Sequence, residues 1–196
     1  LNEYVDYFII IEGSKTWQNN KKNLNFDINK FKKFQEKIIY IPVTDLPDGD
    51  NPYDRENFQR NAISRGIRDA KDDDIIIISD LDEIPDPKKI RSFKHEMRFA
   101  VFKQLHFYYK LNLHSQKNPF WYGSRICVKK FLKSPQWLRN QKIKKKFMGM
   151  FDRGIKIIKN GGWHFSYLKS PAQIRKKIES FAHSEYNKDE YKNLKN

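Results

Sequence analysis

The sequence predicts an α/β fold with a mixed sheet flanked by helices, and three observations predict it. The first half alternates apolar strand-like runs with amphipathic helical segments, a pattern typical of a parallel sheet covered by helices. The second half changes to aromatic-rich strand-like segments. No repeat or linker interrupts the 196 residues, so we expect one domain across residues 1–196.

Apolar, β-branched runs and helical spacing define the elements of the first half. The expected strands are Val5–Ile11, Ile38–Val43 and Asp74–Ser79. Between them, a short helix runs from the cap Asp27 to Gln35 and a longer one covers Arg55–Ala70.

The second half begins with Pro87, which suits the first turn of a short helix ending near Phe93. The expected strands that follow are Phe99–Leu105, Phe107–Leu113, Trp121–Val128, Ile155–Ile158 and Trp163–Tyr167. The expected helices are Ser134–Gln141 and Ala172–His183. The "KNGG" stretch before Trp163 predicts a hairpin turn between the last two strands.

The formal net charge of +15 has two interpretations. It indicates an anionic partner, such as nucleic acid, a membrane surface or a phosphorylated substrate, or it reflects a Lys-, Asn- and Ile-rich composition alone. The single cysteine, Cys127, excludes an intrachain disulfide, and its alternating stretch predicts a small buried apolar residue.

No run approaches the ~20 apolar residues that span a bilayer, and no secretory signal opens the chain. We therefore expect a cytoplasmic protein, free or peripheral at a membrane, from an AT-rich microbe or a large virus. Leu1 runs almost directly into an apolar strand, so we expect an upstream strand to be missing.

The stretch "IIIISDLDEIPDP" ends a buried strand on three acids, Asp80, Asp82 and Glu83. Ligands of open α/β sheets bind at the carboxyl ends of strands. Two carboxylates one residue apart suit Mg²⁺ or Mn²⁺, whose shell is usually completed by water and substrate phosphates. The motif therefore predicts a metal site and a diphosphate substrate. The alternative is a solvated acidic loop that caps the helix at Pro87.

Two further groups of polar residues accompany this motif. In "NGGWHFSY", His164 could complete a carboxylate metal site, or it could be a satisfied half-buried histidine. In "RENFQRNAISRG", Arg60 could reach a phosphate, or it could form a surface ion pair with Glu56 on the same helical face.

A late basic helix, "KKIESFAHSEY", carries Lys177 and His183, which could neutralise a leaving diphosphate. The alternative is a helix whose apolar face packs on the sheet.

Taken in order, these motifs resemble glycosyltransferase family 17. The resemblance rests on "VDYFIIIEGSKTWQNNKK", "RENFQRNAISRGI", "DDIIIISDLDEIPDP", "GGWHFSYL" and "IRKKIESFAHSEY", and it covers most of the chain. It implies a GT-A fold around a mostly parallel sheet and a UDP-sugar donor, most simply UDP-N-acetylglucosamine. It also implies Mn²⁺ or Mg²⁺ at Asp80-Leu81-Asp82, inversion at the anomeric carbon, and a glycan or glycoprotein acceptor.

The resemblance also suggests residue roles. His164 becomes a third metal ligand or a phosphate contact. Trp121 and Tyr122 lie on a strand that could offer a stacking surface for the acceptor sugar, and the alternative is that they are core aromatics. The candidate bases that deprotonate the acceptor hydroxyl are Glu83, Asp152 and Glu185. The candidate nucleotide contacts are Glu12, Arg60, Asn61, Asp80, Lys177 and His183.

Two rival functions use the same residues. A metal-dependent nuclease or nucleotidyltransferase would use the acids with two metals and the basic surface for a nucleic acid backbone. Because the basic residues are dispersed, no nucleic acid partner is expected. A non-catalytic sugar-binding relic of the GT-A fold is the second rival, and the retained Asp80 and Asp82 argue against it.

Overall fold

The computed structural model describes residues 1–143 and 155–180, and these group into two compact units. The two-stranded unit comprises residues 2–68 and the chain from Lys169 onward. The six-stranded unit comprises Asp69–Leu168. The expected single domain stays a prediction. No helix in the described ranges is long and apolar enough to cross a membrane.

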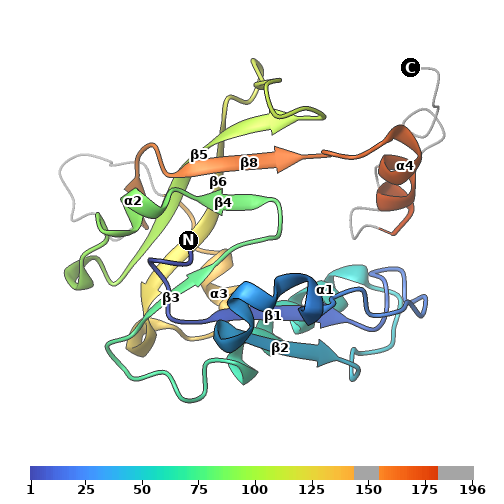
Figure 1. Ribbon diagram of the computed structural model, residues 1–196, viewed down its shortest axis with the longest axis horizontal. Coiled ribbons are helices and arrows are strands. Elements are labelled where there is room, and N and C mark those ends of the chain that lie inside the picture. Colours follow the sequence, from blue (N-terminus) through green and yellow to red (C-terminus); the bar gives the residue numbers. More distant parts are fainter. Residues whose placement is uncertain (144–154, 181–196) are drawn as a thin grey trace. The chain divides into compact units, whose positions relative to one another are not determined.

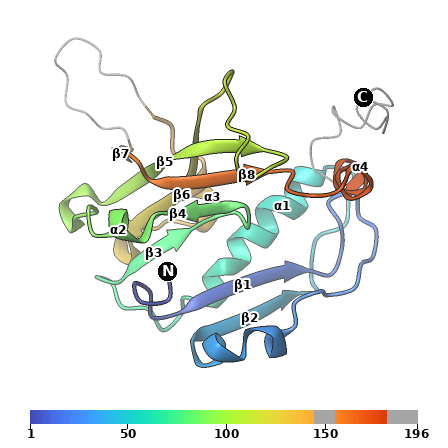
Figure 2. The same ribbon diagram turned by 45° about the horizontal axis from the view of Figure 1, so that its top comes forward.

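The two-stranded unit is built on the parallel strands β1 (Phe8–Gly13) and β2 (Ile38–Val43), seen side by side in Figures 1 and 2. The segment between them contains a 3-10 helix, Ile28–Lys37, which Asp27 caps as expected. The expected helix over Arg55–Ala70 is the α-helix α1 (Pro52–Asn61) followed by a 3-10 turn, Ala62–Arg65. The strand–helix–strand prediction is confirmed for this unit.

Close packing holds the helical segment of this unit against its two strands. Val43, Leu46 and Ala62 form a buried cluster that Ile11 and Phe58 extend. Gly66 ends the 3-10 turn against the sheet, since a Cβ there would lie 2.7 Å from Ile9 Cγ2. A larger residue at this position would push the turn off the two strands. Helix α4 (Pro171–Ser180) also belongs to this unit.

The six-stranded unit has one mixed sheet with strand order β3-β6-β5-β8-β4, and β7 pairs with β5 (Figure 1). The strands are β3 (Ile75–Ile78), β4 (Glu83–Pro85), β5 (Phe99–Tyr108), β6 (Phe120–Val128), β7 (Lys156–Ile158) and β8 (Gly162–Ser166). Its α-helices are α2 (Pro87–Ile90) and α3 (Pro135–Arg139). Its 3-10 helices are His95–Met97 and Lys129–Phe131.

The α/β class and the mixed sheet are confirmed, but the expected mostly parallel central sheet is not found. β3 pairs antiparallel with β6, as do β6 with β5 and β8 with β4. Only β5–β8 and β5–β7 are parallel in this sheet. The aromatic-rich strand β6 of the second half is therefore the neighbour that runs antiparallel to β3. The two strands expected over 99–105 and 107–113 are the single strand β5, which ends at Tyr108.

The hairpin predicted from "KNGG" is wrong. β7 and β8 do not pair with each other, because both run parallel to β5, at Ala100–Phe102 and Leu105–Tyr108 respectively. The Gly161 N–H donates to the Lys103 carbonyl oxygen at 2.8 Å, so the backbone stays beside β5 through the break. The glycines therefore mark a break between β7 and β8, and the chain continues along β5 in the same direction instead of reversing.

The sheet has one face of buried polar residues. Gln104 and His106 are buried on β5, while Leu105 between them is 38% exposed. The β5–β6 register shifts between Val101 and Lys103, a bulge of the kind that re-aims side chains. Apolar residues of β5 and β6 are buried as well, and Phe102, Ile126 and Cys127 are completely buried. Burial raises the pKa of the Cys127 thiol to about 12, which confirms the prediction of an inert apolar residue.

Candidate functional site

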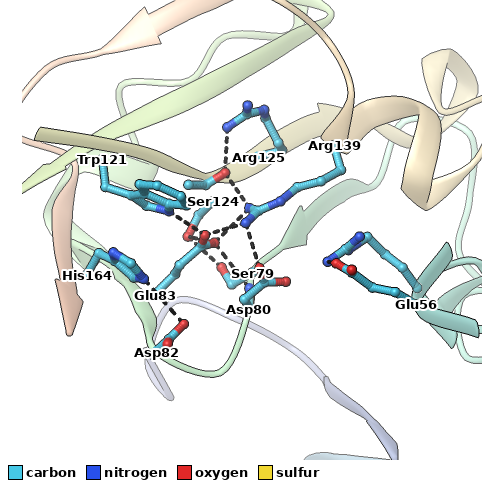
Figure 3. Close-up of polar contacts among 12 residues, drawn as sticks. Glu56, Ser79, Asp80, Asp82, Glu83, Trp121, Ser124, Arg125, Arg139 and His164 are labelled. Atoms are coloured by element: carbon cyan, nitrogen blue, oxygen red, sulfur yellow. Dashed lines mark hydrogen bonds and ion pairs between the residues drawn. The ribbon is translucent and has the colours of Figure 1, made fainter. Parts of the chain in front are cut away.

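The three acids of the motif follow β3 on a turn, and their side chains have different surroundings. The turn is closed by the Glu83 N–H, which donates to the Asp80 carbonyl oxygen at 3.0 Å. The Asp80 and Asp82 side chains are 41% and 30% exposed, whereas that of Glu83 is 1% exposed. Figure 3 shows Glu83 turned toward Trp121 and Arg139. Two of the acids are thus available to a ligand, and the third belongs to the interior.

Both carboxylate oxygens of Glu83 accept hydrogen bonds from neighbours in the unit. One oxygen accepts from the Trp121 indole at 2.7 Å, and the other from the Asp80 N–H at 3.1 Å. Both also accept from Arg139. A carboxylate with its lone pairs occupied in this way is poorly placed to take a proton from an acceptor hydroxyl. The geometry favours a structural role for Glu83.

Arg139, at the end of α3, is a site residue that sequence reasoning missed. Its guanidinium lies 2.7 Å from Asp80 Oδ2 and contacts Glu83, and its side chain is only 13% exposed. The two partners precede it by 59 and 56 residues, so no local pattern links them. Within the expected helix over 134–141, nothing distinguished Arg139 from the many other basic residues of the chain.

His164 lies on β8, opposite both Glu83 on β4 and His106 on β5. Its Nε2 is 3.5 Å from Asp82 Oδ1, and its ring stacks on Trp121 with centroids 4.6 Å apart. His164 is therefore brought to the acidic turn, as the metal interpretation requires. Trp121 donates to Glu83, packs on His164 and remains 38% exposed, and its stacking on an acceptor sugar stays a prediction.

His106 was not singled out from the sequence, yet it is central to the polar layer. Its Nδ1 is 3.2 Å from the Asn118 carbonyl oxygen, and its ring centroid is 4.6 Å from that of His164. Burial, together with His164 nearby, lowers the pKa of His106. In the described part of the chain, His106 Nε2 and His164 Nδ1 are buried without a hydrogen-bond partner. The unpartnered nitrogen of His164 is therefore not the one that lies beside Asp82, which is Nε2.

The residues fit a divalent cation held by few protein ligands. Asp80 and Asp82 offer hard oxygen atoms, and His164 adds a nitrogen beside Asp82. Within residues 1–143 and 155–180, no three His, Cys, Asp or Glu side chains gather closely enough to form a cage. Mg²⁺ and related ions commonly bind through one or two carboxylates and take their other ligands from water and phosphates. The donor set thus suits an ion that binds together with a diphosphate.

The two-stranded unit has a cavity of about 210 Å³ at the carboxyl end of β1. It is lined by Ile11, Glu12, Gly13, Lys15, Thr16, Trp17, Lys22 and Gln59. Arg55, itself 1% exposed, supports this wall by donating to the Trp17 carbonyl oxygen at 2.8 Å. Two lysines, an indole and neutral hydrogen-bonding groups therefore meet in one hollow.

Glu12 lines this cavity, but its carboxylate is occupied by the protein. It accepts from the Asn25 and Phe26 N–H groups, Lys22 and Tyr40 at 2.7 to 3.0 Å. Burial alone would raise the pKa of Glu12, but these hydrogen bonds outweigh it and lower the pKa to about 2. Glu12 therefore holds the loop over residues 22–26 and shapes the cavity wall.

The Glu12 pKa predicts a pH-dependent contribution to stability. Because the folded pKa is depressed from 4.5, the contribution is complete above pH 4.5 and is lost as pH falls toward 2. We expect about 2–3 kcal/mol at neutral pH. Urea unfolding of wild type and Glu12→Gln between pH 3 and 7 should show a stability difference that shrinks on acidification. A difference that is constant with pH would contradict this assignment.

The remaining predicted residues have separate positions. Arg60 forms the expected ion pair with Glu56 on α1, at 2.9 Å, and Asn61 is exposed at the end of that helix. Lys177 is half-buried on α4. Three predicted residues lie outside the described ranges, namely Asp152, His183 and Glu185.

Comparison with known proteins gives one family. No match was found among curated proteins or among solved structures. The model of glycosyltransferase family 17 matches residues 1–196, which include the acidic turn, the histidine strand β8 and the cavity of the two-stranded unit. A match over this whole range agrees with the order of motifs from which the resemblance was drawn. The chain belongs to glycosyltransferase family 17.

Proposed function

We propose that this glycosyltransferase moves N-acetylglucosamine from UDP-N-acetylglucosamine to a hydroxyl of a glycan acceptor, with inversion and a bound Mn²⁺ or Mg²⁺. The observation that carries the proposal is the pair of half-buried carboxylates, Asp80 and Asp82, on a turn that the buried Glu83 anchors. A cation held by only two carboxylates needs further oxygen ligands, and the diphosphate of a sugar nucleotide can supply them. The resemblance to the family supports the donor and the stereochemistry.

Asp80 and Asp82 would hold the cation, and His164 lies beside Asp82 to join or orient it. A bound cation supplies positive charge that offsets the charge developing on the leaving UDP. The chain itself keeps the acids in place: the β4–β8 pairing fixes Glu83 opposite His164. Inversion needs a carboxylate on the far side of the sugar to accept the hydroxyl proton. Since Glu83 is occupied, Asp152 and Glu185 are the better candidates for this base.

The cavity at the end of β1 is the proposed contact for the nucleotide. Lys15 and Lys22 line the cavity, paired with Asp48 and Glu12 respectively, and Trp17 offers an indole beside Thr16. The parallel pair β1–β2 that carries this cavity supports the strand–helix–strand start expected of a GT-A-type fold. Glu12 would act indirectly, through the loop that it holds.

Calorimetric titration tests the proposal. We expect UDP and UDP-N-acetylglucosamine to bind when Mn²⁺ is present. In EDTA both should bind at least about tenfold more weakly, because at least one charge-assisted contact is lost. ADP is the matched control, because it has the same diphosphate with a different base. Equal binding in EDTA would contradict the metal role, and equal binding of ADP would contradict uridine selection.

Two further measurements separate the rival functions. Metal-dependent binding without donor hydrolysis or transfer to any glycan would favour the non-catalytic relic. Salt-sensitive binding of duplex DNA, with no UDP binding, would favour the nuclease or nucleotidyltransferase.

A further inference from the structure

Glu83 and Arg139 form a buried two-point ion pair inside the six-stranded unit. Arg139 Nη1 donates to Glu83 Oε2 at 2.8 Å, and Nη2 donates to Oε1 at 2.5 Å. Their side chains are 1% and 13% exposed. A fork of this kind fixes the orientation of both groups, because a planar guanidinium matches a carboxylate in only a few geometries. The pair is thus a rigid link between α3 and the start of β4.

The same pair holds Asp80 by its side chain and by its backbone. Arg139 Nη2 also donates to Asp80 Oδ2 at 2.7 Å, and Glu83 Oε2 accepts from the Asp80 N–H at 3.1 Å. Figure 3 shows these contacts converging from α3 and β4. Asp80 therefore cannot turn without breaking a charge-assisted bond, and its partner two residues on, Asp82, is fixed on the same short turn.

Close packing prevents Glu83 from taking another position. A Cβ on Gly123 of β6 would lie 2.5 Å from Glu83 Oε1, so the strand presses directly on the carboxylate. The Gly123 carbonyl oxygen accepts from Arg139 at 2.6 Å on the other side of the pair. Glu83 and Arg139 are therefore enclosed by β6 as well as bonded to each other.

We infer that Arg139 and Glu83 are positioning residues that pre-organise the Asp80–Asp82 turn for a divalent cation, an inference that rests on the proposed function. The motif's third acid is then not a reacting group but the anchor of the first two. Arg139 also shares its charge with Asp80, so it limits the repulsion between the two acids before the cation binds. A site that is held ready in this way loses less conformational freedom when its ligand arrives.

The test is the Mn²⁺ dependence of transfer. In Arg139→Gln we expect the Mn²⁺ concentration for half-maximal rate to rise about tenfold, because roughly one charge-assisted contact is lost. At saturating Mn²⁺ the kcat should return to within about threefold of wild type, because the ion then imposes the geometry itself. Glu83→Gln should shift in the same direction, and the double variant should be no worse than the poorer single one.

Arg125→Gln is the matched control. Arg125 is also buried, and its guanidinium donates to the Tyr122 and Gly123 carbonyl oxygens, so it shares one acceptor with Arg139. Its replacement removes a buried guanidinium whose hydrogen bonds go to carbonyl oxygens, so the hydrogen bonds between Arg139 and the acids stay in place, although the charge of Arg125 also acts on Glu83 and Asp80. An equal shift of the Mn²⁺ dependence in Arg125→Gln would overturn the inference. Where Arg139→Gln does not fold, Arg139→Lys keeps the charge but loses the fork, and it should show a smaller shift in the same direction.

Amide hydrogen exchange separates failure of the inference from failure of the proposed function. Without metal or donor, the N–H groups of Asp80 and Glu83 should exchange about tenfold faster in Arg139→Gln than in wild type, and no faster in Arg125→Gln. Unchanged exchange in Arg139→Gln overturns the positioning role whatever the activity. Faster exchange in a protein whose wild type shows no transfer would support the anchor and count against the proposed function alone.

Discussion

Asp82→Asn is expected to lower kcat/KM for transfer by roughly 100-fold or more, which is about 3 kcal/mol of transition-state stabilisation. Asparagine keeps the size of the side chain and one oxygen, but it loses the charge that would hold the cation. Asp82 is the acid beside His164, at 3.5 Å, while Asp80 is also bonded to Arg139. Its carboxylate therefore has the larger part in binding an added ion.

The matched control for this prediction lies four residues further along the same motif. Asp86 caps α2 by accepting from the Lys88 N–H at 2.9 Å, and asparagine caps helices equally well. Asp86→Asn should keep wild-type activity and stability, although it removes the same charge. Steady-state kinetics and Mn²⁺ titration on both variants make the comparison. Full activity in a folded Asp82→Asn would contradict the metal assignment, and a loss in Asp86→Asn would point to a general charge effect.

The parts of the fold that the sequence predicts are those governed by local physics. Ile38–Val43 is an apolar β-branched run, and it is strand β2 with those bounds. Asp27 caps its helix as predicted, because a short polar side chain can accept from an exposed N–H. Strand pairing depends on neighbours far along the chain. The direction of β3 relative to β6, and the shared pairing of β7 and β8 with β5, therefore could not be read from local patterns.

The candidate site divides in the same way. Asp80, Asp82 and His164 stood out because carboxylates at a strand end and a histidine after two glycines carry a chemical pattern. The different burial of Glu83 had no such signal, since it is set by Trp121 and Arg139 from other elements. His106 falls between the two expected strands, 99–105 and 107–113, and nothing marks it until β5 runs through it and β8 brings His164 beside it. Tertiary contact decides which of several similar acids is exposed.

Gly162→Ala is expected to destabilise the protein by about 3–5 kcal/mol, a large share of the stability of a typical domain. Gly162 has φ +120°, which costs other residues about 1–3 kcal/mol. A Cβ would also overlap the Ile84 carbonyl oxygen and lie 2.6 Å from the Asp86 nitrogen, and backbone atoms cannot move aside cheaply. β4 would be forced away from β8. We expect thermal unfolding, followed by circular dichroism, to shift by about 10 °C or more.

Gly49→Ala isolates the contribution of the overlap. Gly49 has nearly the same φ, +121°, but an added Cβ there meets nothing within 4 Å. It should therefore show only the conformational cost, about 1–3 kcal/mol. If the two variants unfold at the same temperature, β4 and β8 are not packed as tightly as the structure has them. If only Gly162→Ala is severe, activity should fall even in its folded fraction, because Glu83 pairs with His164 two residues beyond the glycine. The contact between β4 and β8 would then set both the stability of the sheet and the position of the acidic turn.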